Sequence, residues 1–211
     1  MGVFSYTKRF VSLYLLKKKW KHFNSHNQTS PENIFPLGIV TVGKHCYGPL
    51  EIYSWGEAEE GLIIGSYVSI AYGVKFVLGG NHRMNTFTTY PIKAMFLGEK
   101  VDSLSKGKII VEDDVWIGTD ALILSGAHIG KGAIIGARTV VSGNIPAYAV
   151  VVGNPGRIIK YRFNNKLIDE LKKIDLQNIP DDFFRKNVDL LYKSLTQDNL
   201  AYIIERLRIL K

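Results

Sequence analysis

A six-residue repeat is the feature that most constrains how this chain of 211 residues can fold. Stepping by six, one position always carries isoleucine or valine: Ile117, Ile123, Ile129, Ile135 and Val141. The position two residues earlier always carries a small or β-branched side chain: Val115, Ala121, Ala127, Ala133 and Thr139. Chance seldom fills such a two-position template in so many consecutive repeats. The pattern is therefore typical of a solenoid, in which each repeat packs on its neighbours.

Each hexad predicts one short, flat side of a coil. The branched aliphatic points inward, the small residue fills the tight space beside it, and the glycine that often follows permits the turn, as at Gly118, Gly130 and Gly136. Three hexads close a triangular coil of 18 residues, and stacked coils pair as parallel β-strands. The step continues upstream through Ile64, Ile70 and Phe76, and Val42-Gly43 predicts a further rung with Cys46 in the small inward position.

The repeat is interrupted between Phe76 and Val111, so that residues 77–108 leave the coil. This stretch contains Gly79, Gly80, Pro91 and Gly98 but no hexads. Excursions of this length in a compact domain are usually functional or disordered. The aromatic residues in it, Phe87, Tyr90 and Phe96, predict that it packs against something.

Several motifs in and after this excursion carry a family resemblance. They are GGNHRMN…TYP, GKIIVEDDVWIG and IGKGAIIGARTVVSGNIPAYAVVVGNPGRIIKYRF, preceded by IFPLGIVTVGKHCYGPLEIYSWG. Together they resemble the xenobiotic acetyltransferase branch of the hexapeptide-repeat acyltransferases, which includes type B chloramphenicol, streptogramin and many sugar O-acetyltransferases. The resemblance implies a mainly β protein, a left-handed parallel β-helix with an extended catalytic loop, and acetyl-CoA as the cosubstrate. It is less specific for the acceptor.

The resemblance also implies a role for particular residues. His82 takes the position of the catalytic general base, and histidine suits proton transfer near neutral pH. The transfer would be direct, in a ternary complex. The family's coenzyme A positions correspond to Thr119, Ala137 and Ser142 on the coils, with Arg157 and Lys160 placed after the final turn to meet phosphates.

Acceptor contacts are a weaker inference from residue type. Glu51, Tyr53 and Trp55 are polar or aromatic, as sugar-facing surfaces tend to be, and could equally be surface decoration of a rung. Trp116 points away from the core because it alternates with Val115 and Ile117. We interpret Trp116 as a wall of the active-site cleft, with a contact between subunits as the alternative.

The chain divides into parts of different composition. Residues 1–33 predict a basic N-terminal helix and a polar linker, residues 34–163 the β-helix domain, and residues 164–211 α-helices that cap the open end of the β-helix. No apolar run is long enough to span a membrane, and the start lacks the pattern of a secretory signal. A single cysteine excludes a disulfide framework and fits a reducing compartment, so we expect a cytoplasmic protein.

The net charge of +8 is unevenly distributed, because the first 24 residues hold six Lys and Arg and no acid. A uniformly basic nucleic-acid binder would not show this concentration, so we expect no nucleic-acid partner. Two interpretations of the segment stay open: a surface helix that packs on its own protein or a neighbour, and a helix that lies on an anionic membrane. The first is preferred because apolar side chains wrap most of the helix.

These observations predict an acetyl-CoA-dependent O-acetyltransferase that acts on a hydroxyl of a surface polysaccharide or its precursor. The resemblance implies a homotrimer with active sites between subunits. Alternatives are an antibiotic O-acetyltransferase of the chloramphenicol or streptogramin type, an amino-sugar N-acetyltransferase, and an inactive scaffold or binding module. A zinc carbonic anhydrase would need three converging histidines, whereas only His82 and His128 lie near the repeats, so no metal is expected.

Overall fold

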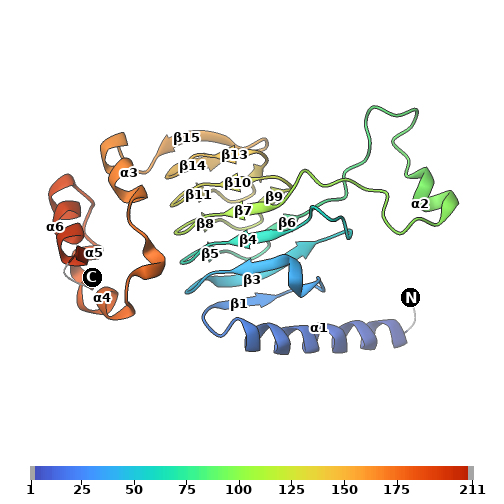
Figure 1. Ribbon diagram of the computed structural model, residues 1–211, viewed down its shortest axis with the longest axis horizontal. Coiled ribbons are helices and arrows are strands. Elements are labelled where there is room, and N and C mark those ends of the chain that lie inside the picture. The colour runs from blue at the N-terminus through green and yellow to red at the C-terminus, as the bar shows by residue number, and fades with distance from the viewer. Residues whose placement is uncertain (1–2, 209–211) are drawn as a thin grey trace. The chain divides into compact units, whose positions relative to one another are not determined.

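The computed structural model of the protein describes residues 3–208. The chain divides between Arg162 and Phe163 into two compact units. The first unit is a stack of coils with short parallel strands on its sides, and the second is helical (Figure 1).

Three faces make up the coil stack, and hydrogen bonds join strands one coil apart. The β6 face contains β3 (Tyr47–Tyr53), β6 (Lys75–Val77), β9 (Leu122–Leu124) and β12 (Val140–Val141). The β8 face contains the start of β3, followed by β5 (Ser69–Ile70), β8 (Trp116–Ile117), β11 (Ile134–Ile135) and β14 (Ala149–Val152). The β4 face contains β2 (Val40–Val42), β4 (Leu62–Ile64), β7 (Ile109–Val111), β10 (His128–Ile129) and β13 (Asn144–Ile145). Ile117 pairs with Ile135, and Ile123 with Val141, which confirms the turn of 18 residues. An antiparallel strand, β15 (Arg157–Tyr161), pairs with β14 and follows the last coil.

The interior of the stack is the predicted column of aliphatic side chains. Every residue of both hexad positions between 115 and 141 is buried, as are Ile64, Ile70, Phe76 and Cys46. Burying one such aliphatic side chain contributes about 1.5–3 kcal/mol relative to exposure. The repeated inward positions are therefore the main source of stability of the stack.

The turns differ from the prediction. The residue just before each small inward position, not the glycine after the aliphatic, has a positive φ; examples are Asp114 (59°), Asp120 (58°) and Gly126 (74°). Gly118 serves close packing instead, because a Cβ there would lie 2.7 Å from the Ala137 nitrogen of the next coil. Asp is one of the few residues that visit the left-handed region readily, so the hexad needs glycine mainly where coils approach each other.

Helix α1 (Val3–Phe23) lies across the N-terminal end of the coil stack (Figure 1). Trp20 is buried in the core, and its indole N–H donates a 3.0 Å hydrogen bond to the Thr29 hydroxyl. The polar segment that we predicted to be a linker contains a strand, β1 (Gln28–Pro31), in parallel register with β3. The open edge of the first coil supplies backbone hydrogen-bonding partners for this segment. The free energy of these hydrogen bonds outweighs the low strand propensity of the sequence QTSP. A short 3-10 helix, η1 (Leu37–Ile39), precedes β2.

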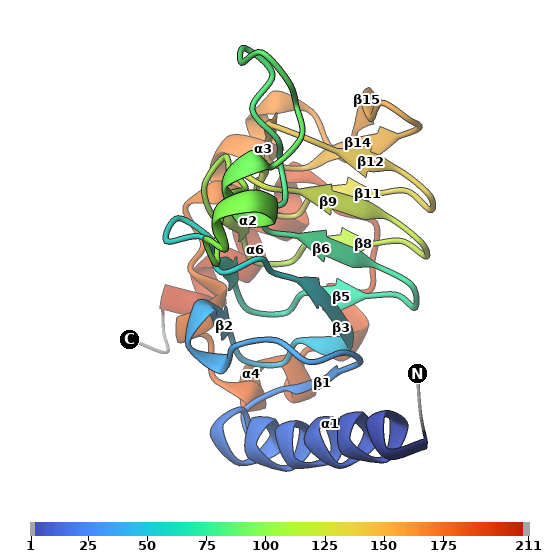
Figure 2. The same cartoon turned by 90° about the vertical axis from the view of Figure 1, so that its right-hand side faces the viewer.

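The excursion leaves the stack after β6 and returns at β7, close to the predicted bounds. It projects beyond the coils and carries a short helix, α2 (Ile92–Leu97), that the sequence did not indicate (Figure 2). Gly98, in the left-handed conformation, ends this helix.

The second unit consists of α3 (Asn165–Lys172), η2 (Leu176–Asn178), α4 (Asp181–Lys186), α5 (Val188–Leu191) and α6 (Gln197–Arg208). The Asn164 side chain caps α3 by accepting the Leu167 N–H, and Asp181 and Asp182 lie in the first turn of α4, where the helix dipole favours acids. Ile179, Phe183 and Ile203 form the centre of a small apolar core. Among the described residues, no helix has the length and apolar character needed to cross a bilayer.

Candidate active site

The root of the excursion is fixed to the coil by a compact hydrogen-bond network. Asn81 and Leu104 exchange backbone hydrogen bonds of 3.0 and 2.8 Å, which tie the outgoing and returning strands together. The Asn81 side-chain amide donates to the Leu104 carbonyl (3.0 Å) and to the hydroxyl of buried Ser125 (3.2 Å). Ser105 donates to the carbonyl of Leu78 at 2.6 Å. His82 therefore follows Asn81, which is bonded both to the returning strand of the excursion and to the coil.

The imidazole of His82 is exposed and oriented by one hydrogen bond. Its Nδ1 lies 2.6 Å from the backbone carbonyl of Thr89, further along the excursion. A carbonyl oxygen can only accept, so Nδ1 carries the proton of the neutral ring and Nε2 keeps its lone pair. This tautomer is the one in which Nε2 can accept a proton from another molecule.

A buried carboxylate packs against Gly79, the first of the two glycines before Asn81. Glu60 accepts hydrogen bonds from the Ser54 hydroxyl and from the Trp55 and Gly56 N–H groups, and it is 4% exposed. A Cβ at Gly79 would collide with the Glu60 carboxylate, and one at Gly80, whose φ is 78°, would lie 2.8 Å from the Trp55 ring. The role of Glu60 does not show in the sequence, because a lone acid among loop residues carries no signal of burial.

The residues predicted to contact the acceptor fall into two groups. Glu51 and Tyr53 lie side by side on the β6 face, and the Tyr53 hydroxyl donates to the Glu51 carboxylate. That hydrogen bond raises the pKa of Tyr53, with a smaller effect of burial. Trp55 follows at the root of the excursion, next to Gly80. Trp116 points outward as predicted and is 53% exposed, but it lies on the β8 face, away from this group.

An open pocket of about 330 Å³ lies on the coil beside the root of the excursion. Asn81 and Lys106 line it from the excursion, and Leu124, Ser125 and Ser142 line it from the coils. Of the predicted cofactor residues, Ser142 therefore shares a pocket with Asn81, the residue just before His82.

The other predicted cofactor residues occupy a different edge. Thr119 and Ala137 are exposed and lie one coil apart at the corner between the β8 and β6 faces, beside the Asp120–Arg138 ion pair. Arg157 and Lys160 are exposed on β15. Within one chain, this corner and the excursion do not form a common pocket among those described.

Cys46 has the structural position that its place in the hexad predicts. Its thiol is buried and donates to the Gly65 carbonyl at 3.0 Å. Burial raises the pKa of the Cys46 thiol to about 11, so it is protonated near neutral pH. His128 points outward, with Nε2 2.7 Å from Glu112 Oε1. Across residues 3–208, no cluster of three or more His, Cys, Asp or Glu could hold a metal ion.

Comparison with known proteins identifies the repeat. Residues 108–143 match the family described as bacterial transferase hexapeptide (six repeats). The chain is 39% identical over 137 residues to a probable macrolide acetyltransferase of Lysinibacillus sphaericus, covering 62% of this chain and 76% of the relative. It is 37% identical over 124 residues to a chloramphenicol acetyltransferase of Klebsiella aerogenes, covering 56% of this chain and 59% of that relative.

A solved structure supports the same relationship. A maltose O-acetyltransferase from Clostridium difficile superimposes with a TM-score of 0.50 and 26% identity, covering 65% of this chain and 67% of that one. Sequence relatives, the repeat family and the fold agree, and the chain belongs to the hexapeptide-repeat acyltransferases as an acetyl-CoA-dependent acetyltransferase.

Proposed function

We propose that this protein transfers the acetyl group of acetyl-CoA to a hydroxyl of a saccharide, with His82 as the general base. The observation that carries the proposal is the hydrogen bond from Nδ1 of His82 to the Thr89 carbonyl, because it leaves Nε2 available on an exposed ring. The neighbouring Tyr53 and Trp55 supply exposed aromatic surface, and Glu51 a carboxylate. Aromatic rings beside polar groups suit the apolar faces and hydroxyls of a sugar.

The reaction proceeds in one ternary complex. Nε2 of His82 takes the acceptor's hydroxyl proton as that oxygen attacks the thioester carbonyl carbon, which gives a tetrahedral intermediate. The carbon–sulfur bond then breaks, and His82 returns the proton to the departing thiolate. The products are an acetyl ester and the free thiol of coenzyme A. Backbone N–H groups at a coil edge would stabilise the oxyanion.

For the cofactor, we propose that Thr119, Ala137 and Ser142 contact the pantetheine arm and that Arg157 and Lys160 contact phosphates. Exposure of all five residues supports this assignment. Because Thr119 and Ala137 lie at a different corner from the excursion, we propose that each site forms between subunits of a homotrimer whose coils wind left-handed, as the family does. The apolar surface of the excursion, with fully exposed Phe87, supports the same assembly.

The second candidate is acetylation of an antibiotic hydroxyl. The names of two relatives, a macrolide and a chloramphenicol acetyltransferase, favour it. The two candidates share His82 and acetyl-CoA and differ only in the acceptor. An acceptor panel therefore separates them.

The test is thiol release from acetyl-CoA with sugars, amino sugars, nucleotide-sugars, oligosaccharides, chloramphenicol and a macrolide. We expect release with a saccharide, and a decrease in kcat of about 10²–10⁴-fold in His82→Ala because proton transfer is lost. His128→Ala, at an outward coil histidine, is the matched control and should retain activity. Release with antibiotics alone would replace the saccharide by the second candidate, and full activity in His82→Ala would disprove the role of the histidine.

A further inference from the structure

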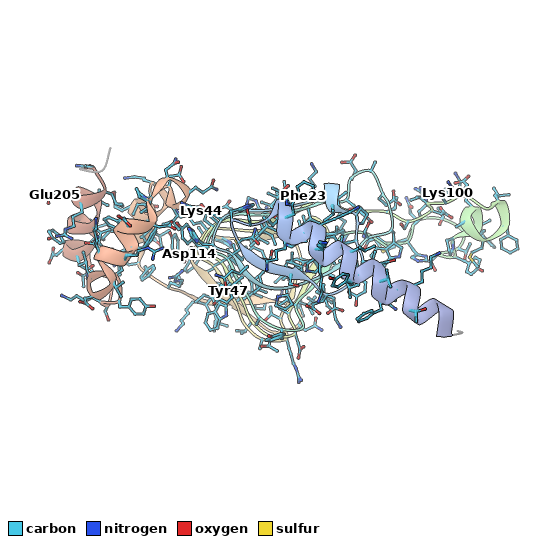
Figure 3. The ribbon with its side chains drawn as sticks, turned by 90° about the horizontal axis from the view of Figure 1, so that it is seen from below. Phe23, Lys44, Tyr47, Lys100, Asp114 and Glu205 are labelled. Carbon is cyan, nitrogen blue, oxygen red and sulfur yellow. The ribbon has the colours of Figure 1, made fainter. Side chains whose placement is uncertain are left out.

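Helix α1 has two faces with different surroundings. Leu16 packs against the core and Trp20 is buried in it, so this face belongs to the coil stack, as the preferred interpretation of the sequence expected. The opposite face holds Val11, Tyr14, Leu15 and Lys18, at the i, i+3, i+4, i+7 spacing of one helical stripe. Figure 3 views the protein from below, with α1 nearest to the viewer and Phe23 near one end of it.

The outer stripe is apolar and exposed. Val11, Tyr14 and Leu15 are 53%, 62% and 50% exposed, and Phe10 at its edge is 74% exposed. A single exposed apolar side chain is ordinary, but a run of them along one helix face marks an interaction surface. The outer stripe therefore has the character of an interaction surface.

The charges around the outer stripe indicate what kind of surface it suits. Lys8, Lys18, Lys19 and Lys21 are exposed on or beside it, and the sequence has no acid before Glu32. Glu32 forms an ion pair of 3.2 Å with Lys17. A second copy of this helix would bring cations against cations without compensating carboxylates, which is unfavourable. An anionic bilayer is complementary to both the lysines and the apolar side chains of the stripe. The lysines contact lipid phosphates while the apolar side chains enter the headgroup region.

We propose that the outer stripe of α1 docks this protein on the surface of an anionic phospholipid membrane. Because α1 lies across one end of the coil stack, docking sets the first unit end-on to the bilayer and leaves the excursion with His82 free along its side (Figures 1 and 2). The proposal does not depend on the identity of the acceptor.

The test is flotation of the full-length protein with vesicles of phosphatidylcholine alone or of an equal mixture with phosphatidylglycerol. We expect binding to the anionic vesicles, weakening as salt is raised. Lys18→Gln/Lys19→Gln/Lys21→Gln should weaken partitioning on the order of 100-fold, from the effect of three lysines near an anionic surface. Lys166→Gln/Lys172→Gln/Lys193→Gln removes the same charge from exposed positions of the second unit and should bind like wild type.

A second variant tests the apolar contribution. Val11→Ser/Tyr14→Ser/Leu15→Ser should reduce vesicle binding while leaving thiol release and particle size unchanged. Absence of binding to anionic vesicles, equal binding to both vesicle types, or equal loss in the two lysine variants would overturn the proposal. A smaller particle for the serine variant would overturn it too, since the occupant of the stripe would then be another copy of the chain.

Discussion

The chemistry of single residues at the candidate site depends on the hydrogen-bonding partners that the surrounding loops and coils supply. The Thr89 carbonyl selects the tautomer of His82, and the Asn81 side chain is held by Leu104 and Ser125. Glu60 accepts from three donors of residues 54–56 and packs against Gly79, near Asn81. Orientation of a base matters for rate because proton transfer needs hydrogen-bond distance and alignment.

Replacing Glu60 by alanine should destabilise the protein and slow catalysis. The N–H groups of Trp55 and Gly56 would lose their acceptor, at a cost of about 1–3 kcal/mol in the free energy of unfolding. Urea denaturation measures the loss, and thiol release measures the change in kcat. The matched control is Glu59→Ala, at an exposed neighbour that should be nearly neutral. Equal stability of the two variants would show that the buried carboxylate has no supporting role.

At the scale of elements, the excursion is a long loop with a short, fixed root. Its outer part carries α2 and many exposed side chains, whereas its two ends meet at the Asn81–Leu104 bridge. Hydrogen bonds at the root limit how far motion of the outer part can displace His82. The inward aliphatic side chains of the coil beneath belong to one buried, closely packed cluster.

Loosening the root should reduce kcat more than it raises KM for acetyl-CoA. In Asn81→Ala the side-chain hydrogen bonds to Leu104 and Ser125 are lost, and we expect kcat to fall about 10–100-fold from misplacement of His82. Hydrogen exchange of residues 79–107 should accelerate in parallel. Asn85→Ala changes an exposed asparagine of the same loop and should behave like wild type. A change in KM alone would assign Asn81 to cofactor binding instead.

At the scale of the whole molecule, the candidate residues lie at separate places on the first unit. Ser142 shares a pocket with Asn81, while Thr119 and Ala137 lie at another corner and Arg157 and Lys160 on β15. The excursion exposes four large apolar side chains to 71% or more: Met84, Phe87, Phe96 and Leu97. Contact between the excursion of one subunit and the coil of another would account for the separation of the candidate residues and for the exposed apolar side chains.

We therefore expect light scattering to give the mass of three chains. Phe87→Ser/Phe96→Ser should lower the fraction of trimer and the activity together, because a few buried anchor side chains, each worth more than about 1 kcal/mol, carry most of the binding energy of an interface. Tyr192→Ser, at an equally exposed aromatic residue of the second unit, is the control and should change neither. A wild-type protein that is monomeric and fully active would contradict the assembly.

The sequence by itself determined the repeating architecture, because an inward position every six residues can be filled only by side chains that pack in a column. It predicted the 18-residue coil, the buried Cys46, the outward Trp116 and the bounds of the excursion. It also identified the enzyme family, since His82 and the motifs that follow are local in sequence.

Only the tertiary structure decided the contacts between segments with no common pattern. The β1 strand forms where an open coil edge offers partners, and Glu60 is buried where Gly79, at the start of the excursion, packs against its carboxylate. The separation of Trp116 from Tyr53 and Trp55 follows from the three-sided coil, which turns successive strands to different faces. Periodicity fixes which side chains point inward, but long-range packing decides which outward side chains meet.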